Sequence, residues 1–230
     1  MTKTSTSDND EFNHRYSYAV KTKPIKAIQA MISSLSPHGE IRTLTKNKTY
    51  RINEEADGEG VIIILDGIAT VTNTESGHYL YTTYPPSILG FIHSYSLYYN
   101  LPNMTRHSIL AETDVNYIFI SLQKFVDVMD ETNGWHDVAR ILAHRLMLAS
   151  SKDVEFIDGN AYKMMRSLIQ EVWLYPEEYR AQINLPNFIK KRTGLSRTRI
   201  MTILTDLKEG GYITVENGKL ISVIKLPSAY

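Results

Sequence analysis

Residues 194–213, with the sequence GLSRTRIMTILTDLKEGGYI, carry an apolar stripe behind two arginines. Ser196 stands just before the stripe, where a helix N-cap is expected, and Gly210-Gly211 follows it, where a helix ends. The stretch therefore predicts one amphipathic helix that opens with Arg197 and Arg199. The stripe consists of apolar residues spaced as on one face of a helix: Ile200, Ile203, Leu204 and Leu207.

The flanking sequence completes a DNA-binding layout. Residues 161–175 form an apolar helical pattern through Met164, Leu168, Val172 and Trp173, and WLYPEEYRAQ is expected to be a loop. Pro186 begins a further helix, and Gly194 turns it into the next. Asn217-Gly218 then lies between two β-branched runs and predicts a hairpin, because both turn positions need a positive φ. Residues 158–230 are thus predicted to be a winged helix-turn-helix domain.

The charges of this region favour double-stranded DNA as a partner. The whole chain has 25 basic and 25 acidic residues, yet residues 180–205 hold only basic ones. Arg197, Thr198, Met201 and Thr202 are the expected base contacts, because the start of such a helix enters the major groove. The same layout also occurs in proteins that dock on protein, so an interaction adaptor is the alternative. Phosphate contacts are expected from three further cations: Lys190, Lys191 and Arg199.

The N-terminal half has the sequence pattern of a helix followed by several strands. Residues 1–16 are polar and are expected to form a flexible tail, and Pro24 begins a helical pattern. Short β-branched and aromatic runs then follow between turn signals, as in VIIILDGIATVTN at 61–73 and DVNYIFIS at 114–121. Residues 17–132 are therefore predicted to be a small β-barrel or sandwich, so the fold class is α+β.

A long helix is expected to join these two parts, at residues 133–157. From Trp135 to Val154 there is neither proline nor glycine. The helix is apolar on more than one side, with Ile141 and Leu148 beside the main stripe, so it has to be covered from two directions. A second copy of the same helix is the most economical cover and predicts a homodimer; burial within one monomer is the alternative. The expected dimer interface is the main stripe: Val138, Leu142, Leu146 and Ala149.

Composition excludes several classes of protein. The 230 residues include no cysteine, which removes disulfides, thiolate catalysis and iron–sulfur clusters. The sequence has no run of about 18 apolar residues and no secretory h-region, so a cytoplasmic protein without a membrane partner is expected. Metal-ligand spacing, a nucleophile elbow and a phosphate-binding glycine loop are also missing, so neither an enzyme nor a bound metal or cofactor is expected.

The order of these parts and the motif G-L-S-R-x-x-I-x-x-I-L-x-x-L resemble the family of the cyclic-AMP receptor protein and FNR, and within it the IprA-like enterobacterial branch. The resemblance covers residues 46–224 and is most specific at Gly194–Leu207, VIIILDGIATV and AHRLMLASS. It implies a cyclic-nucleotide-binding-like β-roll, a dimerisation helix and a DNA-reading winged helix. It also implies that Arg197, Thr198 and Thr202 occupy base-reading positions of a bacterial transcription regulator.

The sensor region departs from the family pattern. Cyclic-nucleotide-binding members carry a Gly-Glu pair and a later Arg-Ser pair, which hold the ribose and the cyclic phosphate. This chain has Gly90-Phe91 and Arg106-His107 instead, which predicts a degenerate ligand pocket that does not bind cyclic AMP. The aromatic segment that follows Phe91 either fills the roll or lines an apolar pocket for an unknown effector. Haem ligation by His93 or His107 is disfavoured. RNA polymerase is a partner only if the protein activates transcription.

Overall fold

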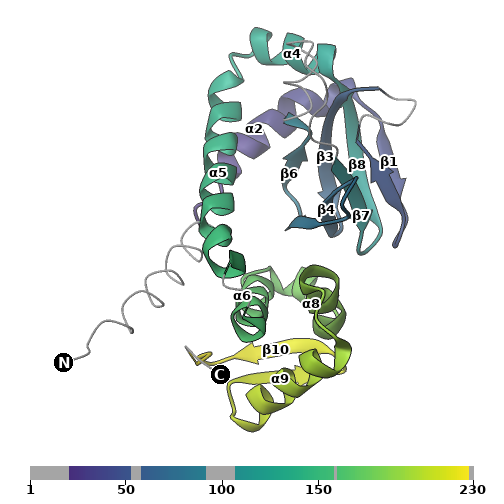
Figure 1. Ribbon diagram of the computed structural model, residues 1–230. Helices are drawn as coiled ribbons and strands as arrows, with labels where there is room; N and C mark the ends of the chain where they lie inside the picture. Colours follow the sequence, from purple (N-terminus) through teal and green to yellow (C-terminus); the bar gives the residue numbers. More distant parts are fainter. Residues whose placement is uncertain (1–20, 53–57, 92–106, 158–159, 228–230) are drawn as a thin grey trace, which may run out of the picture. The chain divides into compact units, whose positions relative to one another are not determined.

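The computed structural model describes residues 21–52, 58–91, 107–157 and 160–227 (Figure 1). These residues form two compact units. One unit is residues 24–142, which contain all the strands of the roll. The other contains residues 143–157 and 160–227 together with the segment 21–23.

The first unit is a sandwich of two antiparallel sheets. One sheet has the strand order β1-β8-β3-β6, formed by Ile41–Leu44, Val115–Ser121, Gly60–Asp66 and Ser87–Leu89. The other has the order β2-β7-β4-β5, formed by Thr49–Arg51, His107–Ala111, Ala69–Asn73 and Tyr79–Thr83. β3 and β4 follow one another along the chain but belong to different sheets, so the chain crosses between the layers at Gly67.

Strand β3 explains how two cores arise from one apolar run. Alternate side chains of a strand point to opposite faces of its sheet. Ile62 and Ile64 face the interior of the sandwich, where they pack with Val71, Ile109 and other apolar side chains of both sheets. Val61 and Ile63 lie in a second core on the outer face of the same sheet. Both faces of β3 are covered, so the strand is a continuous apolar run rather than an alternating one.

Two helices, α2 (Ile25–Leu35) and α4 (Leu122–Glu131), cover the outer face of this sheet and contribute to the outer core of the roll. α2 contributes Ala27, Ile28, Met31 and Leu35, which confirms the helix predicted after Pro24. α4 was not anticipated from the sequence. The sequence nevertheless contains the signals of a helix start and a buried helix face. Ser121 caps α4 by accepting from the N–H of Lys124, and Phe125 and Met129 are buried at helical spacing. A short 3₁₀ turn, η1 (Ser36–His38), follows α2.

α5 (Trp135–Ile157) is the long helix that the sequence predicts. Its first turns belong to the roll, because Val138 and Ile141 are 6% and 2% exposed and lie in the outer core. Among the described residues, no helix is both long and apolar enough to cross a membrane.

The second unit has the predicted winged helix-turn-helix elements in the predicted order. They are α6 (Ala161–Trp173), α8 (Leu185–Thr193), α9 (Arg197–Glu209) and the hairpin of β9 (Ile213–Glu216) with β10 (Lys219–Val223). The segment predicted to be a loop after Trp173 contains one helical turn, α7 (Glu177–Arg180). On α6 the buried residues include Leu168 and Val172, as expected, but Met164 and Trp173 are only half-buried. Met165 and Ile169 are buried in the core of this unit.

Candidate DNA-binding surface

The turn between α8 and α9 is built by local signals. Asn184 caps α8 by accepting from the N–H of Asn187, and Pro186 lies in its first turn. Gly194 ends α8 in the left-handed conformation at φ 66°, which glycine adopts without strain. Ser196 then caps α9 by accepting from the N–H of Arg199 at 3.2 Å. The turn therefore sets both where α9 begins and the position of Arg197 as its first residue.

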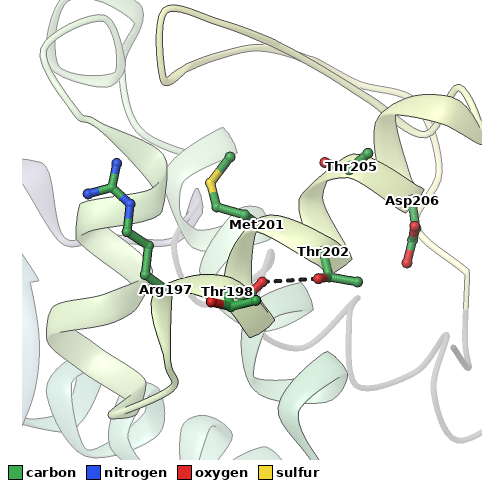
Figure 2. Close-up of a pocket in the computed structure, with 6 residues that line it drawn as sticks. All are labelled: Arg197, Thr198, Met201, Thr202, Thr205 and Asp206. Carbon is green, nitrogen blue, oxygen red and sulfur yellow. Dashed lines mark hydrogen bonds between the residues drawn. The ribbon is translucent and has the colours of Figure 1, made fainter.

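α9 has one buried face and one open face. Its apolar stripe is buried, with Ile200, Ile203, Leu204 and Leu207 at most 2% exposed. The other face is open to solvent and carries an open hollow (Figure 2). The predicted base-contacting residues all line this hollow, together with two residues that were not in the predicted set, Thr205 and Asp206. The hollow is lined by Arg197, Thr198, Met201, Thr202, Thr205 and Asp206.

Thr205 and Asp206 differ in whether the sequence predicts their place on the open face. Thr205 lies three residues after Thr202 and points away from the apolar stripe on a helical wheel, so the spacing alone places it on the open face. Asp206 shows no such signal, because a carboxylate is unfavourable near phosphates and is not expected on a DNA-facing surface. It lies at the end of the hollow away from Arg197 (Figure 2).

The predicted phosphate-contacting cations are all exposed. Lys190 and Lys191 lie in the last turn of α8, and Arg199 lies in the first turn of α9. Arg192 belongs to the same basic window but is buried at 7% exposure. Its guanidinium carbon lies 3.5 Å from the centroid of the Phe188 ring, and Nη1 donates to the Phe188 carbonyl oxygen. Arg192 is therefore part of the domain core and adds nothing to the charge offered to DNA.

The wing is attached to the start of α8. Asn217 and Gly218 have φ values of 49° and 77°, as the two-residue hairpin turn requires. The carbonyl oxygen of Gly218 accepts from the N–H of Leu185 at 2.7 Å. This bond joins the tip of the wing to the N-terminal end of the helix before α9, so the wing has a defined position on the domain.

The predicted dimer stripe on α5 divides into two parts. Val138 departs from the prediction, because its side chain is in the outer core of the roll and has little surface left for a second copy. Leu142 and Leu146 are 40% and 69% exposed, and Ala149 is exposed as well. Ala139 is also exposed and extends this stripe at the same spacing. Most of the stripe is thus uncovered in one chain.

The predicted degenerate pocket can be described at three of its four positions. Gly90 has φ 104°, and a Cβ there would come within 2.5 Å of the Gly60 carbonyl oxygen, so only glycine fits. Phe91 is 6% exposed and packs in the outer core, with its ring centroid 5.7 Å from that of Phe125. His107 is half-buried in β7, and burial lowers its pKa. Arg106 and His93 lie outside the described residues.

Phe91 cannot replace the glutamate that binds the ribose in cyclic-nucleotide-binding members, because its side chain has no acceptor and lies outside the sandwich interior. Its ring is held by the helices on the outer face of the sheet and not in the interior of the sandwich. The interior contains a cluster of buried side chains from both sheets, including Tyr50, Leu89 and Tyr117. In the described parts of the chain, no three histidine, cysteine or acidic residues gather as they would around a metal ion.

Comparison with known proteins gives one matching domain family. Residues 161–228 match the family described as "Winged helix-turn-helix DNA binding". The chain is also similar to curated proteins named "Inhibitor of hydrogen peroxide resistance", the IprA proteins. The protein from Escherichia coli K12 is 24% identical over 208 residues, which cover 90% of this chain and 98% of the relative. The one from Salmonella typhimurium is 22% identical and covers 91% and 98%.

Solved structures give the same fold. The c-di-GMP-responsive global regulator CLP of Xanthomonas campestris has a TM-score of 0.64 at 12% identity, over 86% of this chain and 100% of that chain. A mutant of CooA from Carboxydothermus hydrogenoformans has a TM-score of 0.58 at 16% identity, over 81% and 84%. A putative regulator of the Crp/Fnr family from Eubacterium rectale has a TM-score of 0.55 at 13% identity, over 85% and 90%.

These findings confirm the resemblance drawn from the sequence, and both CLP and the Eubacterium rectale protein are named as regulators. The chain has the fold of the cyclic-AMP receptor protein/FNR regulators, and its C-terminal part has the winged helix-turn-helix layout of the DNA-binding family that it matches.

Proposed function

We propose that the protein is a sequence-specific transcription regulator that binds double-stranded DNA as a homodimer. The observation that carries the proposal is the division of α9 into a fully buried apolar face and an open face that begins with Arg197. A helix that serves only the domain core has no need of an arginine and exposed threonines at its start. In helix-turn-helix proteins the start of this helix contacts base edges in the major groove.

The charges divide into two roles. Arg197 can donate two hydrogen bonds to guanine O6 and N7, which is the commonest specific contact between a side chain and a base. Three cations lie close in sequence to the turn between the two helices: Lys190 and Lys191 in the last turn of α8, and Arg199 in the first turn of α9. We expect them to neutralise phosphates. Phosphate contacts set the register and most of the salt dependence, whereas Arg197 would choose the base pair.

Dimerisation is supported by the open stripe on α5. Ala139, Leu142, Leu146 and Ala149 follow one another at spacings of three, four and three residues, the a/d spacing of a coiled-coil seam. All four are exposed in one chain. A two-fold pair of such helices would bury this seam and give the protein two copies of α9. Two half-sites about one helical turn apart would then be contacted on one side of a duplex.

The roll is proposed to be a scaffold that does not bind cyclic AMP. At the position where family members have a glutamate that accepts from a ribose hydroxyl, this chain has the buried ring of Phe91. The interior of the sandwich contains a cluster of buried apolar side chains. The names of the curated relatives suggest genes of hydrogen peroxide resistance as the regulated process. Any response to peroxide cannot run through a thiol of this chain, because the sequence has no cysteine.

Selection of duplexes from a random pool tests the proposal. The purified full chain is expected to enrich a two-fold symmetric site, and the Arg197→Ala variant is expected to lose enrichment at one base pair of each half-site. The matched Lys190→Ala variant should keep the same site at lower affinity. A protein-docking adaptor would enrich no sequence, and that result would contradict the proposal.

A further inference from the structure

The open face of α9 carries several side chains that end in methyl groups. Of the six residues that line the hollow, Arg197 and Asp206 are charged, and they lie at its two ends (Figure 2). Between them are three threonines and one methionine: Thr198, Met201, Thr202 and Thr205. All four are exposed to solvent, and the side chain of Met201 is 43% exposed.

The hydroxyl of Thr202 is already used within the helix. Its Oγ1 donates to the carbonyl oxygen of Thr198 at 3.1 Å. The single hydroxyl proton is therefore not available to guanine or thymine acceptors, and the γ-methyl is the group on the other side of the residue (Figure 2). The neighbouring Met201 has no hydrogen-bond donor in its side chain and only a weak sulfur acceptor. The centre of the face thus offers a methyl group and a thioether for apolar contact, and Thr202 keeps only the acceptor lone pairs of its hydroxyl oxygen for a hydrogen bond with a base.

The major groove presents one apolar group to such a surface. Thymine carries a C5-methyl at the groove edge, and apolar side chains and the threonine methyl contact it. Thr198 and Thr205 are seven residues apart, which is about 10 Å along a helix axis at about 1.5 Å per residue. Where the helix axis follows the major groove, this length spans roughly three base pairs at about 3.4 Å per base pair.

We propose that α9 selects half-sites in which a guanine, contacted by Arg197, is followed by about three adjacent positions with thymine methyl groups. The methyl groups are recognised by the apolar contacts of Thr198, Met201, Thr202 and Thr205. This inference rests on the proposed DNA-binding function and adds the chemistry by which the operator is chosen.

Replacing thymine by uracil isolates this contact, because uracil differs from thymine only by the missing methyl. Each uracil placed singly in the half-site of the selected duplex is expected to weaken binding about fourfold where a methyl is contacted, the value of one buried carbon group. The salt dependence should stay the same, because no phosphate contact is changed. Equal affinity for the thymine and uracil duplexes would overturn the inference while leaving DNA binding intact. Failure to bind any duplex would instead overturn the proposed function.

Two variants of Thr202 separate its methyl from its hydroxyl. Thr202→Ser removes the methyl and is expected to bind the thymine duplex about fourfold more weakly, with no further loss when the facing thymine becomes uracil. Thr202→Val keeps a methyl and removes the hydroxyl, so it should retain the preference for thymine. The opposite pattern, with serine retaining and valine losing the preference, would show that the hydroxyl recognises the base and would overturn the inference. Because Thr202 is exposed, both variants are expected to fold, which a thermal melt by circular dichroism checks.

Discussion

The hydroxyl oxygen of Ser196 accepts a hydrogen bond from the backbone N–H of Arg199 at 3.2 Å, and this bond fixes the first turn of α9. The cap places Arg197 at the first helical position, where the exposed N–H groups of the helix end also attract phosphate. The capping residue and the proposed base-contacting residue are thus adjacent in the chain, which links the stability of the helix to the position of the Arg197 side chain.

Removal of this cap is expected to destabilise the C-terminal unit. Ser196→Ala leaves an N–H of the first turn without its partner and should lower the free energy of unfolding by about 1 kcal/mol. Urea unfolding followed by the fluorescence of Trp173, in a Trp135→Phe background, measures the change in this unit. Ser196→Asp is the matched control and should retain the stability, because aspartate caps as well as serine. Equal losses in both variants would contradict the capping role.

Arg197→Ala is expected to weaken binding to the selected duplex by about 1–3 kcal/mol and to relax discrimination at one base pair. The physical reason is the loss of a bidentate contact with guanine. Binding to the selected duplex and to a scrambled duplex of the same length checks both effects. Lys190→Ala is the control, because it should weaken both duplexes by similar factors. If Arg197→Ala did the same, its guanidinium would contact phosphate only.

Leu142→Arg is expected to separate the dimer, because it places a charge at the centre of the seam on α5. Light scattering of the purified variant should give the mass of one chain, and tight binding to the two-fold duplex should be lost. Arg140→Gln is the control, since two residues turn the helix by about 200° and place this exposed side chain on the far side. A Leu142→Arg protein that remains a dimer would show that the interface lies elsewhere.

Cyclic AMP is not expected to raise the melting temperature of the protein at millimolar concentration. A ligand that binds only the folded state raises the melting temperature, and the side chain of Phe91 offers no acceptor for the ribose hydroxyl. A thermal melt with and without the nucleotide measures this, with adenosine monophosphate as the control ligand. A rise of several degrees that is specific to cyclic AMP would contradict the proposed scaffold role.

The roll is expected to lose stability in mild acid through His107. Burial lowers the pKa of His107 below its usual value near 6.5, so the unfolded chain takes up a proton at a pH where the folded chain resists it. The unfolded state then binds more protons, and the free energy of unfolding falls as the pH drops below about 6.5. Urea unfolding monitored by Trp135 should show a smaller drop between neutral and acidic pH in His107→Gln. An identical drop in both proteins would contradict this origin.

The winged helix-turn-helix could be predicted from the sequence because its signals are local. Pro186, Gly194, Ser196 and Asn217-Gly218 each have a backbone role that the residue type itself imposes, and each is found in that role. The spacing of the apolar residues likewise predicted which face of α9 is buried and which is open to solvent. Asp206 was missed because the DNA-facing residues were predicted from positive charge and base-contacting chemistry, and a carboxylate fits neither.

The roll and α5 depended on contacts between distant residues. β3 pairs with β8, whose residues lie 50 to 61 positions further along the chain, and no local pattern contains this pairing. The burial of Val138 also depends on distant residues. Its spacing matches Leu142 and Leu146, but its side chain lies in the outer core with residues of α2 and α4. The division of one helical stripe between a roll core and an open seam is set by tertiary packing. The short helix α4 was locally signalled by Ser121 and Phe125.

The salt dependence of binding to the selected duplex tests the central claim most directly. A dimer that offers Lys190, Lys191 and Arg199 from each chain is predicted to lose affinity linearly on a log–log scale, with a slope of about −5. The selected duplex should bind at least about 10³-fold more tightly than a scrambled one at physiological salt. A protein that binds neither duplex at low salt, or binds both equally with no dependence on salt, would contradict the claim.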